Sequence, residues 1–230
     1  MKGKFWNWVR DETTGSRTLY LDGVISDEVW WGDEVTPALF KADLFAEKGD
    51  ITIWLNSPGG DCFAASQIYA MLMDYPHNVT IKIDGIAASA ASVIAMAGST
   101  TMMAPTAMMM IHNPWTFAMG DTEEMEKAID VLSEVKESII NAYEIKTSLS
   151  RVKISHMMDD ETWMNANKAL ELGFIDSILE DEKTVKPTAT YAFSRKAVFN
   201  SLMEKVKPQE DMKPKISVDS LEKRLHLISH

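Results

Sequence analysis

Two strand-like stretches, each followed by a helix-like stretch, occupy the centre of this 230-residue chain. "DITIWLNSPGG" (50–60) is a β-rich run that stops at glycines, and "CFAASQIYAMLMDY" (62–75) reads as a helix. "NVTIKIDG" (78–85) predicts a second strand, and a second helix is expected over 88–97. Strands and helices that alternate at this spacing indicate βαβ units, whose strands pair in parallel. The sequence therefore predicts an α/β fold with a largely parallel sheet.

The flanking sequence extends this pattern on both sides. A strand is predicted over 17–25, a helix over 33–47, and short strands at 102–103 and 108–111. A strand and a short helix that ends near Gly173 are predicted within 159–180. We expect a body of residues 1–182 and, over 183–230, a linker with a helical tail.

The stretch 120–147 predicts one long amphipathic helix, with Asp121 and Glu124 spaced as in a capping box. Its apolar face is formed by Met125, Ile129, Leu132, Val135, Ile139 and Tyr143. The helix is longer than the usual three or four turns. We therefore expect it to protrude and pack against another subunit, with a core helix as the alternative.

Composition excludes several classes of protein. The net charge of −11 disfavours binding to nucleic acid or to an anionic membrane. A single cysteine, Cys62, excludes a disulfide framework and favours a reducing compartment. We expect neither a signal peptide nor a membrane span, and hence a cytoplasmic protein. No histidine–cysteine grouping has metal-ligand spacing, so neither a metal nor a cofactor is expected.

The run "NSPGG" ends the strand 50–60, just before a predicted helix. Its two glycines, Gly59 and Gly60, permit backbone shapes that other residues avoid. Free N–H groups at such a helix start can hold an anion or a developing oxyanion. An ordinary turn explains the same residues, so this motif alone does not identify an oxyanion-binding site.

The stretch "DGIAASAASVIAMAG" (84–98) places Ser89 directly after a strand and near the start of a helix. Small neighbours leave room for a peptide backbone, and the helix dipole favours negative charge at this point. Ser89 is therefore a candidate nucleophile, in the manner of a strand–nucleophile–helix turn. The alternative is that Ser89 and Ser92 both bond to the preceding turn. Ser92, which lies inside the helix, is expected to serve packing.

A nucleophilic serine requires a base, and His112 is the best candidate. It follows the apolar strand 108–111 and precedes Pro114, whereas His77, His226 and His230 lie in polar turns or in the tail. A titratable residue at the end of a buried strand suits a base, although a structural histidine is common there. Asp159, Asp160 and Glu161 form a carboxylate cluster that supplies candidates for orienting the imidazole.

Three blocks together resemble the Clp protease proteolytic subunit (ClpP) family, and within it the phage-type members associated with head maturation. "LNSPGGDCFAASQIY" is similar to the family's oxyanion-loop segment, "DGIAASAASVIAMAG" to its nucleophile segment, and "MMMIHNP" to its histidine segment. The similarity covers roughly residues 18–179. The resemblance implies a ClpP/crotonase-like fold of stacked βαβ units, with the long helix as the family's protruding handle.

The resemblance also implies a serine endopeptidase. Ser89 matches the nucleophile, His112 matches the base, and Glu161 matches the acid, with Asp160 as the alternative acid. The oxyanion would be held by the backbone N–H groups of Gly60 (or Gly59) and Ala90. The residues that the resemblance implies for substrate binding are Asp61, Asn113, Pro114 and Trp115. The implied assembly is a homo-oligomer of stacked rings that enclose the active sites and cleave polypeptides.

Departures from the housekeeping subunits favour the phage type. The usual acid is aspartate, whereas Glu161 stands at that position. "FWNWVRDE" and "VWWGDEVTPALF" resemble the phage-type proteins, and the tail 183–230 has no housekeeping counterpart. These points weigh against an ATP-driven (AAA+) unfoldase as partner. The main interpretation is therefore a phage or prophage head maturation protease that cleaves scaffold and capsid proteins, acting in the host cytoplasm or in assembling proheads.

Other interpretations remain open beside this one. The chain is alternatively the proteolytic subunit of an ATP-dependent Clp-type protease, or an inactive ring-forming scaffold of the same fold. Crotonase-type acyl-CoA enzymes share a two-amide oxyanion site but do not need a serine–histidine pair. Relatives of signal-peptide peptidases use serine with lysine and a membrane anchor, and no anchor is expected here.

Overall fold

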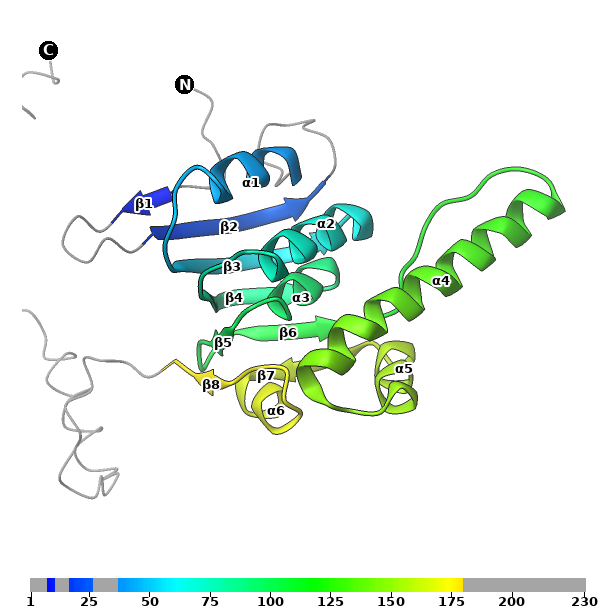
Figure 1. The fold of residues 1–230 in the computed structure, drawn as a ribbon. Helices are drawn as coiled ribbons and strands as arrows, with labels where there is room; N and C mark the ends of the chain where they lie inside the picture. Colours follow the sequence, from blue (N-terminus) through cyan, green and yellow to red (C-terminus); the bar gives the residue numbers. More distant parts are fainter. Residues whose placement is uncertain (1–7, 11–16, 27–36, 180–230) are drawn as a thin grey trace, which may run out of the picture. The chain divides into compact units, whose positions relative to one another are not determined.

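The computed structural model describes residues 8–10, 17–26 and 37–179, which Figure 1 draws in colour. The chain divides into two units, Met1–Asp181 and Glu182–His230. The linker and helical tail expected over 183–230 lie outside the described residues, so they stay a prediction. The two aromatic segments that favoured the phage type, 5–12 and 29–40, also lie mostly outside the described residues.

Strands and helices alternate through the described chain, and the predicted α/β class is confirmed. The strands are β1 Trp8–Arg10, β2 Arg17–Ile25, β3 Ile51–Gly60, β4 Val79–Ala88, β5 Thr100–Met103, β6 Met108–Ile111, β7 Thr162–Asn165 and β8 Ser177–Ile178. The helices are α1 Pro37–Leu44, α2 Cys62–Met73, α3 Ala90–Ala95, α4 Thr122–Thr147, α5 Arg151–Asp159 and α6 Ala166–Glu171.

The strands form one eight-stranded sheet with the order β1-β2-β3-β4-β5-β8, and β6 pairs with both β4 and β7. The pairs β1–β2 and β6–β7 are antiparallel, and the other pairs are parallel. The first half of β4 pairs with β5, and its last residues pair with β6. The carboxyl ends of β3, β4 and β6 therefore meet at one edge of the sheet, where ligands of α/β folds usually bind.

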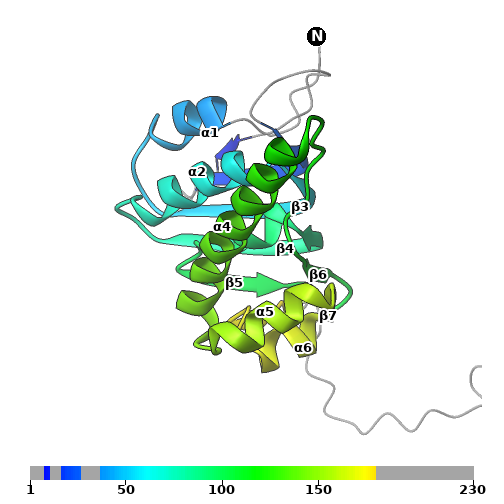
Figure 2. The same cartoon turned by 90° about the vertical axis from the view of Figure 1, so that its right-hand side faces the viewer.

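The two faces of the sheet differ in burial. Along β3 the residues alternate between buried and part-exposed, so one face is covered and the other is more open. Figures 1 and 2 place α1 and α2 over the same face. The core lies between these helices and the sheet and includes Ile53, Ile68, Ile81 and Ile94, each fully buried.

A buried arginine ties the first helix to the sheet. Arg17 begins β2, and its guanidinium donates to the carbonyl oxygens of Asp43 (2.7 Å), Leu44 (3.1 Å) and Glu47 (2.6 Å). The first two carbonyls belong to the last turn of α1, where no intrahelical N–H is available. Arg17 therefore caps the helix with a positive charge, which also suits the helix dipole.

Helix α4 has 26 residues and extends away from the sheet in Figure 1. Its start agrees with the prediction, because Asp121 accepts a hydrogen bond from the Glu124 amide (3.1 Å). The predicted apolar face is buried only near the C-terminal end of the helix, at Ile139 and Tyr143, whereas Ile129 is 61% exposed. The helix is thus anchored to the body at its C-terminal end and uncovered towards its start.

Candidate active site

Ser89 occupies a strained turn between β4 and α3. Its φ of 54° and ψ of −126° lie in a region that residues other than glycine rarely adopt. The turn is held at the next strand, because the Ser89 amide donates to the Met110 carbonyl of β6 (2.9 Å). Strain of this kind, at the point where a strand becomes a helix, exposes the hydroxyl at the edge of the sheet.

His112 contacts the Ser89 hydroxyl directly. Its Nε2 lies 2.7 Å from Ser89 Oγ, which is hydrogen-bonding distance. The pairing of β6 with the end of β4 brings the two residues together, since Ala88 lies opposite Met110 in the register. The serine and the histidine that the sequence singled out are therefore adjacent in the structure.

Ser92 has a different environment. It is fully buried, and its hydroxyl donates to the Ser89 carbonyl oxygen (2.6 Å). The hydroxyl of Tyr143 on α4 lies 2.7 Å from Ser92 Oγ. Ser92 has no hydrogen bond to His112 among the described residues, so it lacks the contact with a base that Ser89 has.

Gly59 packs against the turn that carries Ser89. With φ of +101°, a Cβ added at Gly59 would lie 2.7 Å from both Ser89 Cβ and the Ala88 carbonyl oxygen. The Gly59 amide donates to Ser57 Oγ (3.1 Å), so this N–H is engaged. The glycine is therefore required for the close approach of β3 to the serine, and it is not a free donor.

Gly60 is the better placed of the two glycines as an oxyanion donor. In a parallel ladder a residue bonds to the two neighbours of its partner, and the Ile25 carbonyl accepts from the Asp61 amide (2.9 Å). The Gly60 amide consequently faces away from β2, towards the β4 edge. Ala90 begins α3, so its amide is among the first N–H groups of that helix, which have no intrahelical acceptor.

A cavity of about 370 Å³ lies beside the serine and the histidine. It is bounded by Pro58, Gly60, Ser89, His112, Pro114 and Trp115, together with further residues of the same segments. The chain from His112 to Met119 belongs to no strand. It leads from β6 outward beside α4 to the start of that helix (Figure 1). Its backbone groups are therefore available to pair with an extended peptide.

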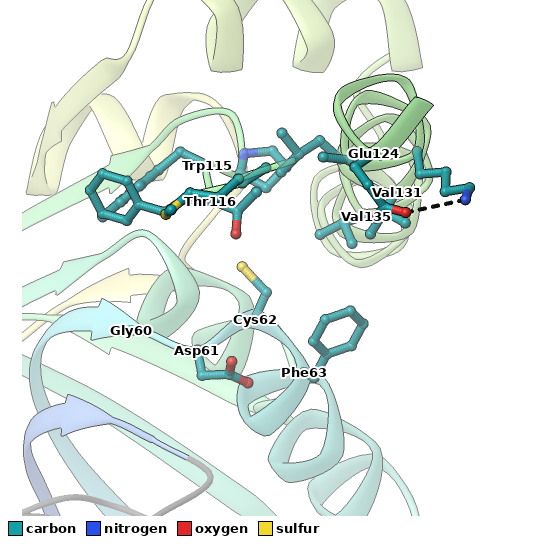
Figure 3. A pocket seen from close by; sticks show the side chains of 16 residues that line it. Gly60, Asp61, Cys62, Phe63, Trp115, Thr116, Glu124, Val131 and Val135 are labelled. Carbon is teal, nitrogen blue, oxygen red and sulfur yellow. Dashed lines mark hydrogen bonds and ion pairs between the residues drawn. The ribbon is translucent and has the colours of Figure 1, made fainter. Parts of the chain in front are cut away.

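A second cavity, of about 460 Å³, adjoins the first and is shown in Figure 3. The start of α2, the segment after Pro114 and the N-terminal half of α4 bound it, and the Cys62 thiol points into it. Burial raises the pKa of Cys62, and the neighbouring Asp61 carboxylate raises it further. The thiol is therefore a neutral apolar contact rather than a second nucleophile.

Two of the predicted substrate-binding residues are engaged within the chain. Asp61 caps α2 by accepting from the Ala64 amide (2.6 Å). Asn113 donates from Nδ2 to Asp159 Oδ1 (2.9 Å), and its own Oδ1 is buried without a partner among the described residues. Trp115 is 68% exposed and packs edge-on against Phe117 at 5.3 Å. Trp115 and Pro114 border both cavities.

The predicted acids are not hydrogen-bonded to His112 in the described structure. Glu161 Oε1 accepts from Trp163 Nε1 (3.1 Å), and Glu161 has a positive φ of 47°. Asp160 ends α5 as its C-terminal cap. The sequence pattern could not give the side-chain orientations of these carboxylates, because Glu161 is oriented by Trp163, and Asp159 by Lys136 and Asn113.

The described ranges contain neither a metal-binding cluster nor a membrane-spanning helix. No group of three or more His, Cys, Asp or Glu side chains is arranged there to hold a metal ion. None of the described helices combines the length and apolar character needed to cross a membrane.

Comparisons with known proteins place the chain beside one family. A family model described as "Clp protease" matches residues 2–182. The "ATP-dependent Clp protease proteolytic subunit" of Porphyromonas gingivalis is 32% identical over 158 residues, which cover 66% of this chain and 71% of the relative. The "ATP-dependent Clp protease proteolytic subunit 1" of Streptomyces avermitilis is 31% identical over 177 residues, covering 76% of this chain and 81% of the relative. The "ATP-dependent Clp protease proteolytic subunit" of Bacteroides fragilis is 32% identical over 165 residues, covering 71% of this chain and 79% of the relative.

Proposed function

This chain belongs to the Clp protease family and is a serine-type peptidase, and we propose that Ser89 is its nucleophile and His112 its base. One observation carries the proposal: Ser89 Oγ lies 2.7 Å from His112 Nε2, at a turn whose φ of 54° is strained. A nucleophile needs a hydrogen-bonded base, and this pair fulfils that condition.

The proposed reaction follows the usual course of acyl transfer. Ser89 Oγ attacks the carbonyl carbon of the substrate peptide bond while its proton passes to His112 Nε2. His112 then donates this proton to the departing amine, and a water molecule hydrolyses the acyl-enzyme by the same route. In the resting state Nε2 must be unprotonated, so Nδ1 must carry the hydrogen.

We propose the amides of Gly60 and Ala90 as the oxyanion donors. The Gly60 amide faces the Ser89 side of β3, whereas the Gly59 amide donates to Ser57. Two backbone donors aimed at the developing charge stabilise it without any reorganisation during the reaction.

Glu161 is the proposed acid, with Asp160 as the alternative. Glu161 Oε1 accepts from Trp163 Nε1, so Glu161 would have to reorient or offer its other oxygen, Oε2, to accept a hydrogen bond from His112 Nδ1. We expect Glu161→Gln to lower kcat by about 10²-fold or more, because the amide cannot stabilise the imidazolium. Asp160→Asn is the matched control. A large loss in Asp160→Asn with an active Glu161→Gln would move the role to Asp160.

The proposed substrate is an extended polypeptide. The cavity beside Ser89, together with the unpaired segment that includes Asn113, Pro114 and Trp115, supports pairing between backbones. The large apolar side chains at this segment favour peptides with apolar residues near the cleaved bond. Asp61, which already caps α2, borders only the second cavity.

We propose that copies of this chain assemble into stacked rings through α4. Val131 is 54% exposed and Ile129 is 61% exposed on its N-terminal half, and nearby Phe117 and Met119 are 89% and 95% exposed. A monomer seldom exposes so many large apolar side chains together, so such a patch typically marks an interface.

The favoured role within the family is that of the proteolytic subunit of an ATP-dependent Clp-type protease. The names of the curated relatives support this role, and they give no support to head maturation. A partner unfoldase would then deliver the substrates. Head maturation remains the second candidate, carried by the sequence of the aromatic segments near the N-terminus.

Hydrolysis assays test both roles in the intact protein. We expect cleavage of short peptides and unfolded proteins by the wild type and none by Ser89→Ala. Degradation of a folded protein only with ATP and a Clp-type unfoldase would support the ATP-dependent role. ATP-independent cleavage of capsid or scaffold protein at defined sites would favour head maturation instead. A wild type that hydrolyses no peptide at all would contradict the proposed function.

A further inference from the structure

A chain of buried hydroxyl groups leads from the long helix to the residue that carries the nucleophile. Ser92 is 0% exposed and Tyr143 is 1% exposed. Ser92 Oγ lies 2.6 Å from the Ser89 carbonyl oxygen and 2.7 Å from the Tyr143 hydroxyl. The Tyr143 ring also packs edge-on against Phe174 at 5.6 Å, which fixes its position. Neither hydroxyl takes part in the reaction as proposed above.

The direction of these hydrogen bonds follows from their chemistry. A carbonyl oxygen can only accept, so the single Ser92 proton must point to Ser89. The Tyr143 hydroxyl must then donate to Ser92 Oγ. Burial raises the pKa of Tyr143 far above its usual value, against a smaller lowering by the Ser92 hydrogen bond. The Tyr143 hydroxyl therefore keeps its proton at neutral pH and can act as a donor.

The Ser89 carbonyl, which accepts the Ser92 hydrogen bond, belongs to the peptide plane between Ser89 and Ala90. The Ser89 carbonyl accepts from the Ser92 amide (3.0 Å) as well as from its hydroxyl. The peptide bond between Ser89 and Ala90 is planar, so a fixed carbonyl direction also fixes the direction of the Ala90 N–H. That N–H is the proposed oxyanion donor, and the same carbonyl direction sets the strained ψ of Ser89.

We propose that Ser92 and Tyr143 are positioning residues, which hold the nucleophile turn and the Ala90 oxyanion donor in their productive orientation. This inference rests on the proposed function, in which Ser89 is the nucleophile. It assigns to α4 a direct connection to the reacting serine, through hydrogen bonds rather than through general packing. A polar network of this kind is effective only while each of its members is satisfied.

Kinetics of Ser92→Ala, Tyr143→Phe and the double variant test the proposal in the full-length protein. We expect kcat for a fluorogenic peptide and the rate of acylation by a fluorophosphonate to fall about tenfold in each single variant, with KM within about twofold. Because the two hydroxyls act in series, the double variant should be little slower than the slower single variant. Tyr143→Phe keeps the ring and so preserves the packing.

Thr101→Val is the matched control. Thr101 is also fully buried, and its hydroxyl donates to the Ala95 carbonyl at the opposite end of α3 (2.9 Å). We expect this variant to lower the melting temperature and to leave kcat and acylation unchanged. Wild-type kcat and acylation in a folded Tyr143→Phe would overturn the inference while the proposed function stands. Absence of acylation at Ser89 in the wild type would overturn both.

Discussion

At the scale of single residues, the site depends on how closely two backbones approach each other. Ser89 adopts its strained conformation while Gly59 passes directly beside it, where any Cβ would lie 2.7 Å from Ser89 Cβ. Real Cβ atoms do not approach that closely. The two nearest atoms, Ser89 Cβ and the Ala88 carbonyl oxygen, cannot move aside as the end of a flexible side chain could. The absence of a side chain at Gly59 is therefore a requirement of the nucleophile turn.

Gly59→Ala should consequently impair turnover beyond its effect on stability. We expect kcat to fall about tenfold or more, because Ser89 has to shift away from His112. Gly49→Ala is the control, since Gly49 has a similar φ of +118° but nothing within 4 Å of the added Cβ. That control should lose about 1 kcal/mol of unfolding free energy and keep its activity. Equal kcat in the two variants would contradict this explanation.

Local sequence was sufficient for some residues of the site and insufficient for others. Ser89 and His112 each follow a strand, a position that a pattern of strands and small residues reveals. Tyr143 was predicted only as part of an apolar face, because its hydroxyl finds Ser92 through the packing of α4 against α3. The orientation of Glu161 depends on Trp163 and on a positive φ, neither of which leaves a local signal.

At the scale of elements, one carboxylate joins three parts of the site. Asp159 at the end of α5 accepts from Lys136 of α4 (2.6 Å) and from Asn113, which follows the base (2.9 Å). Both hydrogen bonds reach the same oxygen, Oδ1. The segment after His112 is thereby connected to α4 and α5.

Asp159→Asn should weaken this connection, and its effect should depend on pH. The hydrogen bond from Lys136, followed by that from Asn113, lowers the pKa of Asp159 from its usual 3.8. A carboxyl with a lowered pKa in the folded state stabilises the protein above its unfolded pKa and loses this effect as the pH falls. The stability difference between wild type and variant, from denaturant unfolding, should be constant above about pH 5 and shrink below it. A difference that grows with acidification would be contrary to this assignment.

The order of elements and the parallel pairing of the central strands could be predicted from the sequence, whereas the pairing around β6 could not. The strand over 17–25 and the helix over 120–147 were predicted within a few residues of β2 and α4. β4 continues to Ala88, three residues beyond the predicted strand end and one residue into the predicted helix. Its pairing with both β5 and β6 depends on contacts distant in sequence, which hydrophobic periodicity does not report.

At the scale of the whole molecule, the uncovered half of α4 is the main structural argument for assembly. Val131→Asp would place a charge within the proposed ring-to-ring interface, where its desolvation costs free energy. We expect the particle mass, measured by sedimentation or light scattering, to fall to that of a single ring. Val131→Thr, which keeps the size of the side chain, should leave the mass unchanged. A wild type that sediments as a monomer, or a Val131→Asp particle of full mass, would refute stacking through α4.

The central claim is that His112 activates Ser89, and one measurement tests it most directly. The native protein is treated with a fluorophosphonate, and the modified residue is identified by mass spectrometry of its peptides, alongside Ser89→Ala, His112→Ala and Ser92→Ala. We predict an adduct on Ser89 in the wild type, a slower adduct on the same residue in Ser92→Ala, and no adduct in the other two variants. Labelling of Ser92 or of another residue, or undiminished labelling in His112→Ala, would contradict the claim.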